Sequence, residues 1–453
     1  MLVTTNNFSI NIINPRILVD ARVFYFWPML QPLFDHFLKY RTVTTDTRNI
    51  TPHSIYFALK GERFNGNLFA QQALDSGCDF AVVDEEVESK DPRIIRVDDA
   101  LKAMQDLALM YRQSLTIPFL AITGSNGKTT TKELIHAVLS KKYKVHATKG
   151  NLNNHIGVPL TLLSIPADAT FAVVEMGANH QREIDSYCQY ALPDFGLITN
   201  IGKAHLEGFG GVEGVKKGKR ELYDFVSKRG GKVFVNTELA NLDEVSQGMD
   251  RISYGFETGD FKLKITGEDP FLRFEYVVDG KTYTVKSKLS GAYNLYNFAS
   301  AIVVGNYFGV TPEAQVESME GYDPDNNRSQ IVRTEKNTLI MDAYNANPSS
   351  MENALINLSR QKGPLYFVMG DMRELGEEGP AEHKAMLDVA SKLKLNGVTV
   401  GDVFLKVEGY DAYPRFKDAE AARAYLTGLD LLDHMILIKG SRGIRLEVLK
   451  DLF

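Results

Sequence analysis

The sequence predicts an α/β protein of three domains, and three observations lead to this. The chain has 453 residues, too many for a single hydrophobic core. Short apolar segments alternate with helical patterns over most of its length, which is typical of parallel sheets with crossover helices. Near residue 124, a glycine-rich loop with a lysine lies between an apolar segment and a helix.

The chain divides into four parts. Residues 1–28 form a leader that is rich in asparagine and then aromatic, with no sustained period, so we expect either upstream sequence or a loosely packed arm. A small α/β domain follows at 29–117 and begins with an amphipathic helix at Met29. The central domain covers 118–325, and a third domain covers 326–453.

In the small domain we expect strands at 54–59 and 80–83 and helices at 68–76 and 100–111. The central domain has apolar strands before a helix that opens at Thr129, and a strand-rich insert before a closing helix. Its expected strands are 119–122, 171–175, 195–199 and 232–235, with the insert strands at 261–265, 271–278 and 282–289 and the closing helix at 294–308.

The polar loop at 322–327 is the predicted linker, and strands and helices alternate again after it. That alternation predicts a Rossmann-like, doubly wound domain. Its expected strands are 338–341, 365–369, 397–400 and 435–439, and its expected helices are 349–358, 383–394 and 419–426.

Composition excludes several classes of protein. A net charge of −6 argues against a general nucleic-acid binder. No apolar run approaches the roughly 18–20 residues that span a bilayer, and the first residues lack the pattern of a signal peptide. Cys78 and Cys188 fit buried thiols in a reducing compartment better than a disulfide. We therefore expect a cytoplasmic protein.

The loop after the strand at 119–122 predicts a site for a nucleoside triphosphate. Gly124 and Gly127 let backbone amides approach an anion, and the following helix points its N-terminus at the same place. Lys128 supplies a charge for the outer phosphates, and the Thr129 hydroxyl can ligate Mg²⁺. Ile122 replaces the first glycine of the common motif, so a plain structural turn is the alternative; the flanking strand and the threonines favour the phosphate site.

Polar residues follow two further strands of the central domain. Glu175 ends the strand at 171–175, where a carboxylate facing a triphosphate is a natural Mg²⁺ ligand; an N-cap or surface role is the alternative. His205 can ligate a second ion or position a phosphoryl group, although a lone histidine is more often structural. Lys216 and Lys217 read as a solvated helix face.

Amides and charged residues gather in other strand-exit loops. Three asparagines at 151–154 supply paired donors and acceptors suited to peptide or sugar recognition, although a turn-rich connector would look similar. In the third domain, the loops at 342–348, 370–376 and 439–443 follow strands and predict one concave edge. That edge can face the nucleotide site across a cleft.

Together these segments resemble the Mur ligases, the ATP-dependent amide-forming enzymes of peptidoglycan precursor assembly. Within that family the chain is most similar to the branch that adds D-alanyl-D-alanine. The motifs that carry this likeness are TDTR at 45–48, ALKGERFNGN at 58–67, GNLNNHIGVP at 150–159, MGANHQREID at 176–185, DAYNANPSSM at 342–351 and GDMRELGEEG at 370–379.

The resemblance implies a two-step reaction. The terminal carboxylate of UDP-MurNAc-tripeptide attacks the γ-phosphate of ATP, and the amine of D-Ala-D-Ala then displaces phosphate from the acyl phosphate. It implies ATP and two Mg²⁺ ions as cofactors, a role in cell-wall synthesis, no nucleic-acid partner and a monomer. Whether the third peptide residue is diaminopimelate or lysine stays open.

The resemblance also implies site residues. Lys128, Glu175, His205 and Lys219 would be catalytic; Thr129 and Glu175 would hold one Mg²⁺, and His205 and a carbamylated Lys219 the second. Nucleotide contacts would come from Gly124, Ser125, Asn126, Gly127, Lys128, Thr129, Thr130, Asn294, Asn297, Arg328, Asp342, Tyr344, Asn345 and Asn347. Substrate contacts would come from Thr47, Arg48, Lys60, Arg63, Asn151, Asn153, Asn154, Asn179, His180, Asp371, Glu374 and Ser441.

Two other functions remain open at this stage. One is another ligase of the same superfamily, such as the enzyme that completes the tripeptide or folylpolyglutamate synthase. The other is a P-loop ATPase whose hydrolysis drives a partner or a conformational change. The modular arrangement also predicts closure about a hinge near Asp325.

Overall fold

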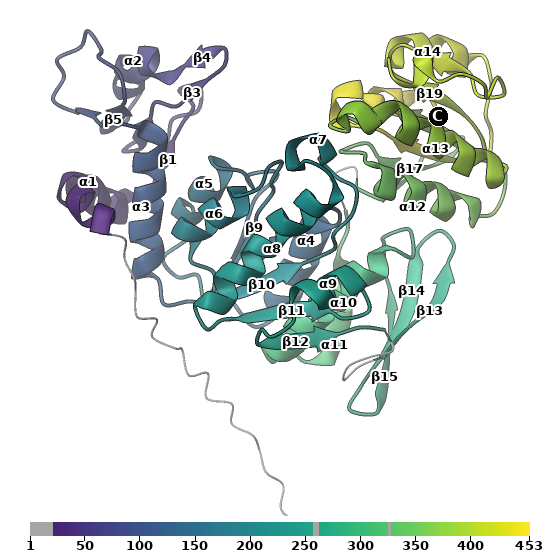
Figure 1. Ribbon diagram of the computed structural model, residues 1–453, viewed down its shortest axis with the longest axis horizontal. Helices are drawn as coiled ribbons and strands as arrows, with labels where there is room; N and C mark the ends of the chain where they lie inside the picture. Colours follow the sequence, from purple (N-terminus) through teal and green to yellow (C-terminus); the bar gives the residue numbers. More distant parts are fainter. Residues whose placement is uncertain (1–20, 257–261, 325–327) are drawn as a thin grey trace, which may run out of the picture. The chain divides into compact units, whose positions relative to one another are not determined.

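The computed structural model describes residues 21–256, 262–324 and 328–453 (Figure 1). Most of the predicted leader, residues 1–20, and the hinge position Asp325 lie outside these ranges. The chain forms two compact units, Met1–Met110 and Tyr111–Phe453. Among the described residues, no helix is both long and apolar enough to cross a bilayer, and Cys78 and Cys188 are free, buried thiols as predicted.

The first unit is built on a parallel sheet in the order β1-β2-β5-β6. Its strands are β1 (Val43–Thr44), β2 (Ile55–Phe57), β5 (Phe80–Val83) and β6 (Ile94–Arg96), with a small hairpin of β3 (Lys60–Gly61) and β4 (Phe64–Asn65). Its helices are α1 (Ala21–Tyr40), α2 (Ala70–Asp75) and the start of α3 (Ala100–Ser114).

The N-terminal helix is longer than the sequence predicted. α1 begins at Ala21, eight residues before Met29. The apolar and aromatic residues at 23–27 extend the helical pattern, and the asparagine-rich residues before them obscured it. Residues 21–28 are therefore helical rather than a leader without regular structure.

The central domain is built on a six-stranded parallel sheet in the order β12-β11-β10-β7-β9-β8. Its strands are β7 (Phe119–Thr123), β8 (Val145–Ala147), β9 (Phe171–Glu175), β10 (Phe195–Ile198), β11 (Lys232–Asn236) and β12 (Arg251–Tyr254). Its helices are α4 (Lys128–Leu139), α5 (Gly157–Leu163), α6 (Glu183–Ala191), α7 (Leu206–Phe209), α8 (Val212–Lys228), α9 (Ala240–Val245), α10 (Asn294–Tyr307) and α11 (Pro312–Gly321).

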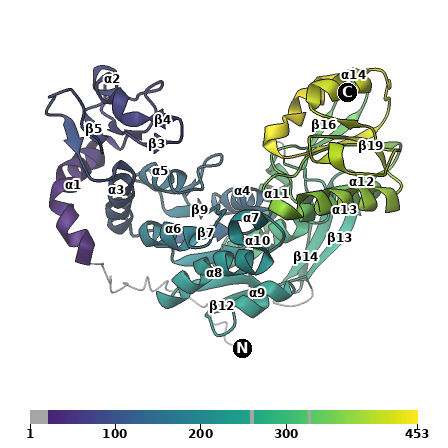
Figure 2. The ribbon, with the colours of Figure 1, turned by 45° about the horizontal axis from the view of Figure 1, so that its top comes forward.

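Helices cover both faces of this sheet, as the alternation of side chains along β10 shows. Leu197 packs into a core with Ile135 of α4 and Phe298 of α10. Its neighbour Gly196 faces the opposite way, where a β-carbon would come within 3.3 Å of Leu222 on α8. Helices α6 and α8 contact each other (Figure 2). Strands buried on both faces explain the continuous apolar runs in the sequence.

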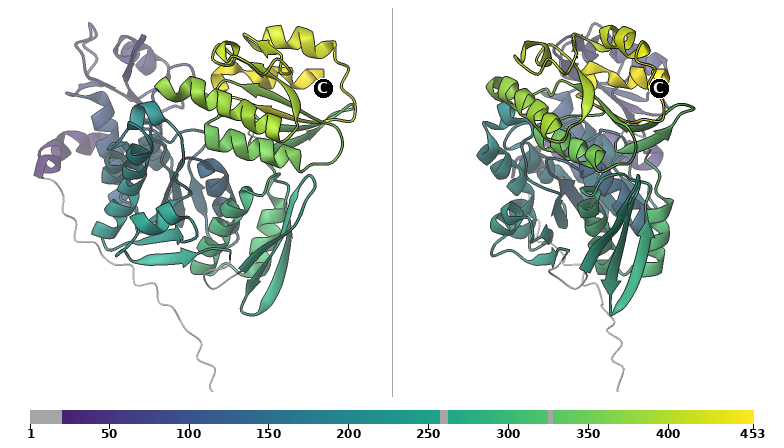
Figure 3. Two further views of the ribbon diagram at one scale, coloured as in Figure 1. Left: turned by 45° about the vertical axis from the view of Figure 1, so that its right-hand side comes forward. Right: turned by 90° about the vertical axis from the view of Figure 1, so that its right-hand side faces the viewer.

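The predicted strand-rich insert is a three-stranded antiparallel sheet of β13 (Lys262–Glu268), β14 (Leu272–Val278) and β15 (Lys281–Lys286) (Figure 3). Side chains along β14 alternate between buried and more exposed positions. Phe274, Tyr276 and Val285 are buried in the same apolar core as α4 and α10. The insert is therefore continuous with the central domain.

The third domain is a mostly parallel sheet in the order β16-β17-β21-β18-β19-β20, with β16 antiparallel at one edge. Its strands are β16 (Gln330–Arg333), β17 (Thr338–Asp342), β18 (Leu365–Gly370), β19 (Asn396–Val400), β20 (Arg415–Phe416) and β21 (Met435–Lys439), and its helices are α12 (Pro348–Ser359), α13 (Gly379–Lys392) and α14 (Ala419–Thr427). The last strand lies between β17 and β18, so the chain crosses over the sheet.

Candidate active site

A cleft of about 1250 Å³ lies within the second unit, at the carboxyl ends of β7, β9, β10 and β17. This is the edge of parallel sheets where ligands bind. Many predicted site residues line it together: Ser125, Asn126, Gly127, Lys128, Thr129, Thr130, Asn151, Asn153, Asn154, Glu175, Asn179, His205, Asn294, Asn297, Arg328, Asp342, Tyr344, Asn345, Asn347 and Glu374. The glycine-lysine loop therefore shares one cavity with Glu175, His205 and Asp342.

The loop between β7 and α4 requires both of its glycines. Gly124 has φ of 145° and Gly127 has φ of 77°, which side-chain-bearing residues rarely adopt. A β-carbon on Gly124 would lie 2.0 Å from Oγ1 of Thr199, and one on Gly127 would lie 2.5 Å from Oδ1 of Asn297. The loop thus fits tightly between the end of β10 and the start of α10.

Lys128 is the first residue of α4 and folds back over the loop. Its Nζ donates to the carbonyl of Gly124 at 2.7 Å and of Ser125 at 3.2 Å. Burial, opposed by Glu175 and reinforced by Arg328, lowers the pKa of Lys128 from 10.5 to about 8. A polyanion beside the loop would favour the charged form.

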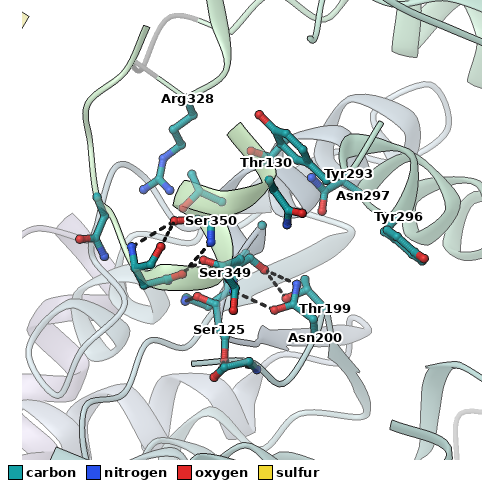
Figure 4. Close-up of a pocket in the computed structure, with 18 of the residues that line it drawn as sticks. Ser125, Thr130, Thr199, Asn200, Tyr293, Tyr296, Asn297, Arg328, Ser349 and Ser350 are labelled. Carbon is teal, nitrogen blue, oxygen red and sulfur yellow. Dashed lines mark hydrogen bonds between the residues drawn. The ribbon is translucent and has the colours of Figure 1, made fainter. Parts of the chain in front are cut away.

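Asn126 connects the loop to two other parts of the site, one of which includes Thr199 and Asn200, labelled in Figure 4. Its carbonyl accepts from Thr199 Oγ1 at 2.6 Å and from Asn200 Nδ2 at 3.0 Å. Its side-chain Oδ1 accepts from Asn347 Nδ2 at 2.7 Å. Asn347 also caps α12 through the amide of Ser350. One asparagine of the loop therefore contacts the end of β10 and the third domain.

Glu175 ends β9 and is 1% exposed. Its Oε1 accepts from the Thr129 hydroxyl at 3.1 Å and from Asn153 Nδ2 at 2.7 Å. Its Oε2 is buried and has no hydrogen-bond partner in the described chain. A buried carboxylate oxygen without a donor is costly, and a bound cation is one of the few groups that would satisfy it.

Lys219 is buried on α8 but does not line the cleft. Its Nζ donates to the carbonyl of Ala178, a lining residue, at 3.3 Å and lies 4.9 Å from the ring centre of Phe209. Burial, together with the charge of Lys128, lowers the pKa of Lys219 well below its ordinary value. Burial of this side chain therefore favours the neutral amine over the ammonium.

His205 and Glu374 contact each other across the cleft, His205 Nδ1 against Glu374 Oε2. Both residues have left-handed backbones, with φ of 52° and 65°. The close contact with His205 is the main cause that lowers the pKa of Glu374. Such backbone conformations in two contacting residues are uncommon and point to a functional constraint.

In the third domain, Asp342 lies at the end of β17 beside a buried lysine. Its Oδ2 accepts from Lys439 Nζ at 2.6 Å, and Lys439 also reaches the carbonyl of Asn345 at 3.2 Å. The guanidinium of Arg328 lies 3.8 Å from the ring centre of Tyr344. Arg328, Asp342, Tyr344 and Lys439 all line the same cleft as Glu175.

Asn294 and Asn297 lie on the first turn of α10 and support the loop. Asn297 Nδ2 donates to Asn294 Oδ1 at 2.8 Å, and Asn297 Oδ1 accepts from Thr131 at 3.0 Å. Their side chains are therefore engaged within the protein, one turn from the phosphate loop.

Several predicted site residues lie outside the residues that line the cleft. Asp371 accepts from the backbone amides of Val403 and Phe404, and Ser441 accepts from the amide of Arg373, so both hold loops of the third domain. His180, Gly124 and Lys219 are also not among the lining residues. Thr47, Arg48, Lys60 and Arg63 belong to the first unit, where Arg48 pairs with Asp46 and Lys60 with Asp84.

The cleft includes residues that sequence reasoning missed. Thr199 and Asn200 directly follow β10, so the rule that used strand ends for Glu175 could have found them. Lys439 ends β21, so the same rule could have identified it as a residue of the site. Phe256, Leu263, Ile265 and Tyr296 form an apolar part of the lining, and no local pattern marked them.

Three protein-family models match successive parts of the chain. Residues 39–112 match the model described as Mur ligase family, catalytic domain. Residues 122–305 match the Mur ligase middle domain, and residues 327–442 match the Mur ligase, glutamate ligase domain. The predicted boundaries at 117 and 325 stay predictions.

Two curated relatives are similar over most of the chain. UDP-N-acetylmuramoyl-tripeptide–D-alanyl-D-alanine ligase of Bacillus subtilis (strain 168) is 36% identical, covering 90% of this chain and 92% of its own. The ligase of the same name from Escherichia coli (strain K12) is 33% identical, covering 89% and 92%.

The chain is also similar to solved structures of ligases of this kind. MurF from Acinetobacter baumannii superposes with a TM-score of 0.83 at 32% identity, covering 91% of this chain and 93% of its own. MurF ligase from Thermotoga maritima in complex with ADP gives a TM-score of 0.82 at 25% identity, covering 91% and 97%. The chain belongs to the Mur ligase family.

Proposed function

We propose that this chain is a MurF-type ligase. It uses ATP to join D-Ala-D-Ala to the terminal carboxylate of UDP-N-acetylmuramoyl-tripeptide, giving ADP and phosphate. The observation that carries this proposal is the single cleft that holds Lys128, Glu175, His205 and Asp342 together. The names of the relatives supply the substrate class.

The first chemical difficulty is repulsion between the substrate carboxylate and the triphosphate. The glycine loop and the N-terminus of α4 favour an anion, and Lys128 adds a full charge. Arg328 lines the same cleft. These groups neutralise charge while the carboxylate attacks the γ-phosphate and ADP leaves, so that catalysis rests on positioning and electrostatics.

The second step is attack of the dipeptide amine on the carbonyl of the acyl phosphate. A new C–N bond forms, the C–O bond to phosphate breaks, and the amine loses a proton. His205 and Glu374 lie in the same cleft and contact each other. Of the three substrate residues predicted in the third domain, Glu374 is the one that lines the cleft. We propose that it faces the incoming dipeptide.

The residues present fit Mg²⁺. The Thr129 hydroxyl and the unpartnered Oε2 of Glu175 are hard oxygen ligands of the kind this ion prefers. When bound, Mg²⁺ neutralises phosphate charge. We propose Thr129 and Glu175 for one ion and His205 and Lys219 for a second.

Lys219 would join that second site as a carbamate. The amine adds CO₂, a C–N bond forms and one proton leaves, which converts a cation into an oxygen ligand. Its complete burial beside the cleft-lining Ala178 supports this, because a buried lone ammonium is costly. Intact-mass measurement under native conditions, with and without bicarbonate, tests for the added CO₂, and Lys219→Arg is the control.

We propose that the first unit binds the UDP-sugar through Thr47, Arg48, Lys60 and Arg63, which lie in or beside exposed loops. Asn151, Asn154, Asn179 and His180 would contact the peptide. Asp371 and Ser441 would act by holding loops of the third domain. The expected closure about 325, the cytoplasmic location and the monomeric state remain proposals; light scattering of the purified protein tests the last.

The deciding experiment is phosphate release from ATP with UDP-MurNAc-tripeptide, with and without D-Ala-D-Ala, followed by mass spectrometry of the product. We expect dipeptide-dependent release and a product enlarged by the dipeptide. Release that depends on a diamino acid or on glutamate would instead assign another ligase of the superfamily. Release without any amine would indicate a P-loop ATPase.

A further inference from the structure

We propose that Lys132 is a positioning residue that sets the carboxylate of Glu175 through Thr148. This inference rests on the proposed function for its kinetic readout, and on the structure alone for its binding readout. Lys132 lies on α4, one turn after Thr129, and its side chain is 4% exposed. Lysine is almost never this buried unless its charge is paired or bonded.

The ammonium of Lys132 donates to the carbonyl of Thr148 at 2.6 Å. The carboxylate of the neighbouring Glu133 lies 3.8 Å away and offsets the burial of the charge. Thr148 is itself 2% exposed, so its carbonyl has little access to water. The bond therefore fixes the exit of β8 to the helix that follows the phosphate loop.

Thr148 then holds the backbone of Glu175. Its Oγ1 accepts from the Glu175 amide at 2.9 Å, and its own amide donates to the carbonyl of Val173 at 3.1 Å. The chain from 148 leads to Asn153, which donates to Glu175 Oε1 at 2.7 Å. Thr129, on the same helix as Lys132, donates to that same oxygen.

These contacts close a ring: α4 to Thr148 through Lys132, Thr148 to Glu175, and Glu175 back to α4 through Thr129. The ring leaves Glu175 Oε2 as the carboxylate oxygen without a partner in the described part of the chain. Lys132 does not line the cleft, so it acts through Glu175 and not on the nucleotide. Groups that orient a metal-binding carboxylate typically change metal affinity or activity 10–100-fold when removed, which is on the order of the effect expected here.

The test replaces Lys132 by methionine, which keeps the length and removes the donor. The binding probe is AMP-PNP, which is titrated into the protein in a calorimeter, once in the presence of MgCl₂ and once in the presence of EDTA. We expect Lys132→Met to weaken binding roughly 10-fold with MgCl₂ and far less with EDTA, and to lower kcat with KM for the UDP-substrate unchanged. Lys132→Arg, which keeps a donor, should recover part of both.

Lys142→Met is the matched control. Lys142 also donates to backbone carbonyls, those of Phe308 and Gly309, but it lies beyond the C-terminal end of α4, away from the loop. Its replacement should leave the ratio of the two AMP-PNP affinities unchanged. If Lys132→Met lowers Tm and leaves that ratio unchanged too, Lys132 is only structural and the proposal is overturned.

Thr148→Val provides the second variant in case Lys132→Met does not fold. It removes the acceptor of the Glu175 amide and keeps the volume and the carbonyl that Lys132 contacts. We expect the same selective loss of MgCl₂-dependent affinity. An unchanged ratio in this variant also overturns the proposal. If the wild type binds AMP-PNP with Mg²⁺ yet forms no amide product, the ligase assignment fails and the positioning role does not.

Discussion

The hydroxyl of Thr129 donates to Oε1 of Glu175 at 3.1 Å, which fixes the first turn of α4 to the end of β9. These two residues come from segments 46 positions apart. The contact uses one carboxylate oxygen and leaves the other, Oε2, buried without a partner among the residues that the structure describes. A carboxylate held in this way is set for a ligand and not for the stability of the fold.

Glu175→Gln should therefore separate activity from stability. We expect kcat to fall on the order of 100-fold, because the charge that the cation and phosphates need is lost. The free energy of unfolding in urea should stay equal or rise by about 1 kcal/mol, because a poorly satisfied buried charge is removed. Glu213→Gln, on the exposed surface of α8, should change neither quantity. A clear loss of stability would contradict this account.

Lys128→Ala should reduce the rate of ATP-dependent phosphate release by on the order of 100-fold or more. Lys128 opens α4 and lines the cleft, whereas Lys132, the other lysine of α4, does not line it. Release is measured with both substrates saturating. Lys144→Ala, at an exposed ion pair with Asp168, is the control. Near-native activity in Lys128→Ala would refute the assignment.

Gly127→Ala should damage the loop more than its backbone conformation alone explains. The residue has φ of 77°, and a β-carbon would lie 2.5 Å from Asn297 Oδ1. Gly230→Ala is the matched control, with φ of 74° and open space around the added carbon. Both variants should lose about 1 kcal/mol from strain. Only Gly127→Ala should lose more and bind nucleotide weakly, as urea unfolding and calorimetry would measure.

His205 and Glu374 should be energetically coupled in catalysis. Each loss of kcat/KM is converted to a free energy. We expect the free-energy loss in the double variant His205→Asn, Glu374→Gln to be smaller than the sum of the losses in the two single variants. Contacting residues typically couple by about 0.5–3 kcal/mol. If the two single free-energy losses add fully in the double variant, the contact between His205 and Glu374 does not contribute to catalysis. Glu382→Gln, which removes the partner of the half-exposed Lys203, is a suitable control.

The protein should lose stability in acid through His146. Burial, reinforced by Lys149, lowers the pKa of His146 from 6.5 to about 4. The unfolded chain therefore binds a proton that the folded chain rejects, and stability falls as pH drops from 6.5 to about 4. Because the ring is partly exposed, we expect a loss on the order of 1–2 kcal/mol. His146→Gln should flatten that part of the urea-derived pH profile; an identical decline would refute it.

The sequence predicted most elements that carry the site because they are local. The strand at 119–123, the glycine loop and the helix after it were all marked by apolar runs and turn residues. The strand-end rule placed Glu175 and His205 in the cleft. The insert was also expected, since its alternating strands differ from the parallel ones around them.

What the sequence missed depends on contacts between distant segments. Nothing near Asn126 indicates that its side chain meets Asn347, 221 positions away. The resemblance implied a substrate role for Asp371, and nothing near it in the sequence indicates that its carboxylate accepts from the amides of Val403 and Phe404. The helix start at Ala21 was missed because the asparagine-rich residues before it obscured the helical pattern.

The three-stranded sheet β13–β15 has one further consequence. Its inner face contributes Phe274, Tyr276 and Val285 to the same apolar core as α4, the helix that opens at the phosphate loop. A shared core couples the stability of the segments that form it, so we expect the insert and the nucleotide domain to unfold together. A substitution that weakens packing inside the insert should therefore also destabilise the phosphate loop, although among the described contacts no insert residue forms a hydrogen bond with that loop.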